Sequence, residues 1–157
     1  MSDPHAYFIT WTTYGTWLPG DPRGWRRREN GSMEPQPRLE TWCKNRMEAE
    51  PVLLRDADRE AVRQACHAHA QIRGWNILAV YVGVNHVHVV VEANEAPQKV
   101  RDQLKANCTR TLRSAPTPLI VEKTWTKGGD CAVLWKEDEV SAAVEYVVEG
   151  QRKTPSG

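Results

Sequence analysis

Two pairs of histidines in this chain have the spacing His-x-His, and one pair suits a metal site. His86 and His88 lie in the run VGVNHVHVVVEA, whose valines are typical of a buried strand. Alternate strand residues project from the same face with Cα atoms roughly 6–7 Å apart, so both rings can converge on one ion. Buried imidazoles without partners are costly. The pattern therefore indicates either a divalent metal site or two hydrogen-bonded structural histidines.

The second pair, His67 and His69, lies in DADREAVRQACHAHAQIR, which has the apolar spacing of an amphipathic helix. Helix positions two residues apart point about 200° from one another. These two imidazoles therefore cannot share an ion, and we interpret them as a helix-face and a helix-edge residue.

A metal bound by two imidazoles needs a third ligand, and oxygen is preferred if the metal is hard and keeps open positions. The last helical pattern, EDEVSAAVEYVVEGQ, offers Glu149 and Gln151 within two turns of Tyr146. Tyr146 itself lies at the edge of an apolar stripe. A half-buried amphipathic tyrosine and a functional phenol are equally good interpretations of that position.

Around these residues the sequence predicts four strands and three helices. Apolar or β-branched runs indicate strands at 6–17, 76–84, 86–93 and 131–136. Apolar residues at helical spacing indicate helices at 56–73, 96–115 and 137–150. The first helix is expected to turn Val62, Ala65, Cys66, His69 and Ile72 inward, and the second Val100, Leu104, Cys108 and Leu112. The middle strands are joined by a short connection and form a hairpin. This order predicts one α+β domain over 1–157, with helices on one face of an antiparallel sheet.

The segment 18–54 is expected to be a long loop rich in proline and arginine, inserted after the first strand. The net charge does not by itself indicate a nucleic-acid partner, because 21 Lys and Arg balance 20 Asp and Glu. The four cysteines have no paired spacing, which is typical of a reduced protein. No apolar run reaches the roughly 18 residues that span a bilayer. We therefore expect a cytoplasmic protein with no membrane partner.

Three blocks of the sequence resemble a known family. ITWTTYGTWLPGDPRGW, VYVGVNHVHVVVE and LWKEDEVSAAVEYVVEGQ together look like the HUH-class single-strand tyrosine transposases. The closest similarity is to the REP-associated tyrosine transposase type within the IS200-like transposase family. The resemblance covers nearly the whole chain, and it implies a bacterial, nucleoid-associated protein with a ferredoxin-like (RRM-like) sheet.

The resemblance also implies residue roles. His86 and His88 would bind Mg²⁺ or Mn²⁺ at the scissile phosphate of single-stranded DNA that forms a hairpin. Tyr146 would attack the phosphorus and form a 5′-phosphotyrosine linkage. That bond would retain the energy of the phosphodiester, so rejoining would need no nucleotide cofactor. Relatives occur as dimers and as monomers, so the resemblance allows a homodimer without requiring one.

The sequence departs from the family at the third ligand. Relatives often carry Gln or Asn four residues after the tyrosine, where this chain has Gly150. A continued helix would put Gln151 about 140° from Tyr146. If Gly150 ends the helix, the chain can turn back. On that condition we favour Gln151 as the third ligand, with Glu149 as the alternative.

Single-stranded DNA binds to cationic groups through its phosphates and to flat side chains through its bases. The arginines of the long loop supply charge beside Trp17, and the second helix is locally basic. The candidates are Trp17, Arg23, Arg26, Arg27, Arg28, Lys99, Arg101, Lys105 and Arg110.

Two other classes of protein compete with a transposase. The same sheet supports RNA-binding modules, and a domesticated relative could bind hairpin DNA or RNA without cleaving it. Such a binder has no use for the histidine pair and a helix tyrosine. A zinc hydrolase is disfavoured because the chain lacks HExxH and a cysteine pair.

Overall fold

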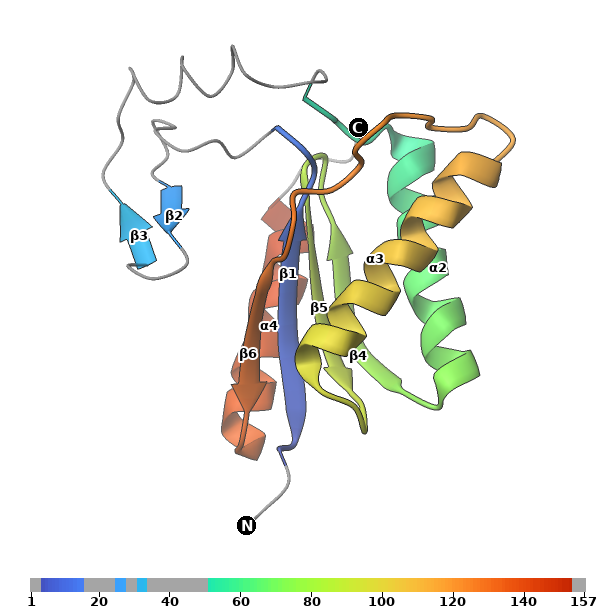
Figure 1. The fold of residues 1–157 in the computed structure, drawn as a ribbon. Helices are drawn as coiled ribbons and strands as arrows, with labels where there is room; N and C mark the ends of the chain where they lie inside the picture. Colours follow the sequence, from blue (N-terminus) through green and yellow to red (C-terminus); the bar gives the residue numbers. More distant parts are fainter. Residues whose placement is uncertain (1–3, 16–24, 28–30, 34–50, 154–157) are drawn as a thin grey trace.

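A computed structural model of the chain describes residues 4–15, 25–27, 31–33 and 51–153. Its centre is an antiparallel sheet of four strands in the order β4–β5–β1–β6 (Figure 1). The strands are β1 (Ala6–Thr12), β4 (Asn76–Val82), β5 (His86–Glu92) and β6 (Asp130–Leu134). With the helices between them, they follow the βαββαβ order of ferredoxin-like folds. The predicted α+β class is confirmed.

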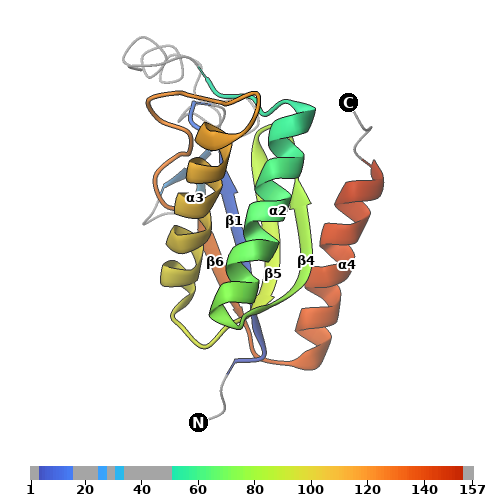
Figure 2. The same cartoon turned by 90° about the vertical axis from the view of Figure 1, so that its right-hand side faces the viewer.

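The helices cover both faces of the sheet (Figure 2). α2 (Asp56–Arg73) and α3 (Pro97–Ser114) pack side by side on one face, and α4 (Glu137–Lys153) lies on the other. The sequence predicted helices on one face of the sheet and a C-terminal helix that carries Tyr146, and it assigned no face to that last helix. The structure shows that this last helix is the sole cover of the second face among the described elements.

The two faces of β5 explain its mixed sequence. Val87, Val89 and Val91 are fully buried in the large core beneath α2 and α3. The alternate positions, His86 and His88, face the α4 side. One face of this strand therefore stabilises the fold, and the other carries the imidazoles.

The helix boundaries and inward faces largely match the sequence pattern. Gly74 ends α2 in a left-handed conformation with φ of 74°. All four inward residues predicted for α3 are buried. The prediction for Ile72 is wrong, because its side chain is 80% exposed. At about 100° per residue it lies just outside the arc of buried residues, about 20° beyond Ala65 at the edge of that arc.

The segment predicted as a loop at 18–54 contains two short strands. β2 (Trp25–Arg27) and β3 (Gly31–Met33) pair antiparallel and form a small sheet of their own. At the end of the segment, Val52 and Leu54 are buried in the main core. Across the described ranges, no helix has the length and apolarity that a bilayer crossing requires.

Candidate active site

His86 and His88 lie together on the α4 face of β5, with ring centroids 4.8 Å apart. On β1 they are paired with Thr12 and Thr10. The other histidine pair diverges as predicted. His67 is exposed, whereas His69 is buried with its Nε2 2.8 Å from Oε1 of Gln103.

Each imidazole of the β5 pair is held through its Nδ1 atom. His86 Nδ1 lies 2.9 Å from Oδ1 of Asn85, an oxygen that accepts, so the ring hydrogen belongs on Nδ1. His88 Nδ1 lies 2.8 Å from the Thr10 hydroxyl, which is able to accept the corresponding hydrogen. Metal-binding histidines commonly use one nitrogen for such a partner and the other for the ion. Both Nε2 atoms suit metal ligation on this ground. Sequence reasoning missed Thr10, because its role depends on the pairing of β1 with β5.

Burial keeps both rings in the form that binds metals. It lowers the pKa of His88 to about 4, and repulsion from His86 adds to the effect. The pKa of His86 is also lowered, first by burial and then by the charge of Arg59. Neutral imidazole is the species that coordinates a metal. Both side chains are therefore neutral at pH 7.

Aromatic side chains fix the two rings from the sides. Tyr81 is buried and stacks on His88 with an interplanar angle of 22° and a centroid distance of 6.4 Å. Its centroid lies 5.5 Å from that of His86. Phe8 meets His88 edge-on at 5.6 Å. Packing of this kind restricts the rings to one orientation.

α4 brings Tyr146 to the histidine pair. Its ring centroid lies 5.8 Å from that of His88, and its side chain is 62% exposed. Ala143, about one turn earlier, and Val147, the next residue, are buried against the sheet. The chain's other tyrosines, Tyr7, Tyr14 and Tyr81, are buried or partly buried. Tyr146 therefore combines exposure with proximity to the imidazoles.

The third ligand depends on how α4 ends. The helix continues through Gly150 to Lys153, so the turn on which Gln151 depended does not occur. In a continuous helix Gln151 is about 140° from Tyr146 and Glu149 about 60°. The side chain of Gln151 lies outside the described residues, and its ligand role stays a prediction. Among the side chains described, no three from His, Cys, Asp and Glu gather as a metal site.

Comparison with known proteins identifies the family. The family model described as "Transposase IS200 like" matches residues 41–149, more than half of the chain. The chain belongs to the IS200-like transposase family.

Two solved structures share the fold of this IS200-like transposase. One is the REP-associated tyrosine transposase bound to a REP hairpin, with a TM-score of 0.53 and 14% identity. The alignment covers 98% of this chain and 74% of that one. The other is a candidate transposase from Deinococcus radiodurans R1, with a TM-score of 0.55 and 15% identity over 96% and 93% of the two chains. No curated protein matches the sequence. At these identities the structures support the fold alone.

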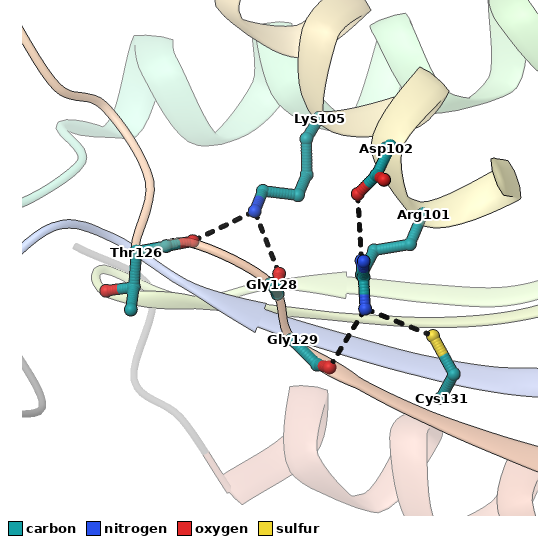
Figure 3. A network of polar contacts seen from close by, with 7 residues as sticks. All are labelled: Arg101, Asp102, Lys105, Thr126, Gly128, Gly129 and Cys131. Atoms are coloured by element: carbon teal, nitrogen blue, oxygen red, sulfur yellow. Dashed lines mark hydrogen bonds and ion pairs between the residues drawn. The ribbon is translucent and has the colours of Figure 1, made fainter. Parts of the chain in front are cut away.

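The predicted DNA contacts of the transposase separate into three groups. Lys99 and Arg110 are exposed on α3. Arg101 and Lys105 are partly buried and bind the segment before β6 (Figure 3). The remaining candidates cannot be placed, because they lie outside the described residues. For Arg26 and Arg27, the backbone is described in β2 but the side chains are not. This last group is Trp17, Arg23, Arg26, Arg27 and Arg28.

Gly83 makes room for the His86 ring. A Cβ atom at Gly83 would lie 2.9 Å from Cε1 of His86 and 3.3 Å from Cε1 of Tyr81. Gly83 is not among the glycines with positive φ, so alanine suits its backbone conformation. The clash with these two rings is therefore the main effect expected of a substitution.

We expect Gly83→Ala to displace the His86 ring and to lower the midpoint of thermal unfolding. In a His86→Ala background, Gly83→Ala should lower the free energy of unfolding by less, because the clash with the His86 ring is removed. A thermodynamic cycle of the two single variants and the double variant measures this coupling. Additive effects would show that Gly83 does not position the ring.

Proposed function

We propose that this transposase nicks and rejoins single-stranded DNA with Tyr146 as its nucleophile. This proposal rests mainly on the position of Tyr146, whose ring centroid lies 5.8 Å from that of His88. The ring centroid of His88 lies in turn 4.8 Å from that of His86. An exposed phenol beside two neutral imidazoles with available Nε2 atoms fits nucleophilic attack beside a metal ion. A purely structural tyrosine would have no need of this arrangement.

In the proposed reaction, Oη of Tyr146 attacks the scissile phosphorus and loses its proton. The bond from phosphorus to O3′ breaks, and the leaving oxygen takes up a proton to become a 3′-hydroxyl. The DNA 5′ end is then joined to Tyr146 as a phosphodiester, and attack by a 3′-hydroxyl reverses the step.

His86 and His88 would hold a divalent cation, Mg²⁺ or Mn²⁺, through Nε2. When bound, the ion would supply charge stabilisation for the phosphate in the transition state. Glu149 is the described candidate for an oxygen ligand, because it is half-buried and lies on the Tyr146 side of α4. Gln151 remains the alternative. The protein side of the site thus provides ligands, their orientation and the nucleophile.

We propose that the DNA substrate contains a hairpin. The solved REP-associated relative was bound to a REP hairpin. On this chain, exposed Lys99 and Arg110 would contact phosphates. No nucleotide cofactor is needed, because the phosphotyrosine bond retains the energy for rejoining.

A covalent adduct assay tests this function. A single-stranded hairpin oligonucleotide labelled at its 3′ end would be incubated with the protein and Mg²⁺ or Mn²⁺. We expect a labelled band at the protein's size on a denaturing gel, lost with a chelator and restored by added metal. Tight hairpin binding without an adduct under any of these metals would instead identify a binding module.

A further inference from the structure

The segment that leads into β6 bulges out of the sheet beside the histidine pair. Thr13 pairs with Trp125, and Thr10 pairs with Asp130. Residues 126–129 therefore lie opposite only residues 11 and 12, which makes a bulge of two extra residues. Thr12 pairs on its other side with His86, so the bulge lies at the histidine end of the sheet. Bulges of this kind are frequent next to active sites.

Two cations of α3 hold the bulge by its carbonyl oxygens (Figure 3). Lys105 Nζ donates to the carbonyl oxygens of Thr126 at 2.9 Å and Gly128 at 2.8 Å. Arg101 donates to the carbonyl oxygen of Gly129 at 3.2 Å, and its Nε is paired with Asp102. These cations, predicted from sequence as DNA contacts, are thus engaged inside the protein.

The hydrogen bonds from Lys105 to the bulge carbonyl groups determine the direction of the amide groups in the same peptide units. In a trans peptide the N–H is directed opposite to the C=O of the same unit. With the Thr126 and Gly128 carbonyls turned to Lys105, the N–H groups of Lys127 and Gly129 point away from α3. Within the described ranges, no acceptor for either N–H is found. Both residues are exposed.

Glycine at 129 allows the bulge to lie directly on β1. Its φ is 135°, and a Cβ there would lie 2.6 Å from the Thr10 carbonyl oxygen. No other residue type fits both the conformation and the close approach. The bulge is therefore fixed from two sides, by the α3 cations and by β1, and its outward amide groups are held in place.

We propose that residues 127–129 bind a backbone phosphate of the DNA strand. The N–H groups of Lys127 and Gly129 and the Lys127 ammonium are the donors, a set suited to an anionic oxygen. The inference rests on the proposed function in taking single-stranded DNA as the ligand. The bulge lies about two strand spacings, roughly 10 Å, from β5. The phosphate bound here is therefore a neighbour of the scissile one.

Lys127→Ala, with Lys136→Ala as its control, tests the phosphate site. Lys136 is also exposed but lies beyond the far end of β6. Affinity for a single-stranded hairpin oligonucleotide would be measured over a range of salt in the Tyr146→Phe background, where no cleavage is expected. Lys127→Ala should weaken binding and reduce the slope of log K against log salt by about 0.7. Lys136→Ala should change neither quantity.

The amide groups are tested by NMR in the same background. Adding the oligonucleotide should shift the N–H resonances of Lys127 and Gly129. Replacing one phosphate by an uncharged methylphosphonate should remove both the shifts and the effect of Lys127→Ala. An unchanged salt slope in Lys127→Ala, or resonances that do not move, would overturn the proposal.

These results separate the phosphate site from the proposed chemistry. If the wild-type protein forms an adduct but the salt slope of Lys127→Ala is unchanged, the phosphate site is rejected and the proposed nicking activity is retained. A reduced slope in a protein that forms no adduct keeps the site and rejects the nuclease. Absence of any binding to single-stranded DNA rejects both.

Discussion

Tyr146→Phe should form no covalent adduct and should lower nicking by at least ~10³-fold, because it removes the only oxygen that can be joined to DNA in the proposed reaction. The ring is 62% exposed and its packing against Phe8 and His88 is retained, so the free energy of unfolding should change by less than about 0.5 kcal/mol. Hairpin affinity and metal affinity should stay near wild type. Gel assays of adduct and titrations of binding measure the two effects separately.

Tyr14→Phe is the matched control for this experiment. Tyr14 is partly buried, and Lys123 Nζ lies 5.4 Å from its ring centroid, a contact that phenylalanine preserves. This variant should nick at the wild-type rate. Nicking by the Tyr146→Phe protein, or mass spectrometry that places a nucleotide on Tyr7, Tyr14 or Tyr81, would contradict the assignment.

His88→Ala should lower nicking by at least ~100-fold and should weaken Mn²⁺ binding, because it removes one of the two proposed imidazole ligands. His86→Ala should do the same. Metal affinity is measurable by calorimetry without DNA, so this test does not depend on turnover. Thermal unfolding of each variant should be measured as well, because both rings are packed by aromatic neighbours.

His67→Ala is the control for both variants. His67 has an exposed side chain on α2, on the opposite side of the sheet from the His86 and His88 rings. Its loss should leave nicking and Mn²⁺ affinity unchanged. If the His86→Ala, His88→Ala double variant nicks as fast as wild type, the metal site proposed on β5 does not exist.

The sequence predicted the parts of the site that depend on local periodicity. Alternation along β5 separates the core valines from the imidazoles, and this is visible in HVHVVVE without any knowledge of the fold. The opposite directions of His67 and His69 follow in the same way from helical geometry. Proximity of Tyr146 to His88 came only from family resemblance, because no local pattern relates α4 to β5.

Other features depend on tertiary packing and could not be read from the chain. Clustered charge on α3 suggested phosphate contacts, yet Arg101 and Lys105 use their donors on carbonyl groups near β6. Gly150 suggested a helix end, but α4 passes through it. Glycine costs only about 1 kcal/mol inside a helix, so neighbouring residues can override it.

The two faces of the sheet pack against apolar clusters of very different size, and the proposed ligands and nucleophile differ in which cluster supports them. The histidines are on a strand in the middle of the sheet, backed by the large α2–α3 core, whereas Tyr146 is on a helix packed on a much smaller apolar cluster. Elements with few buried apolar contacts open at lower free energy than the core. The proposed metal ligands are thus backed by the main core of the domain, whereas the proposed nucleophile lies on a helix that is expected to open at lower free energy. Substitutions on the sheet-facing side of α4 are therefore expected to change the position of Tyr146 while the large core beneath α2 and α3 is retained.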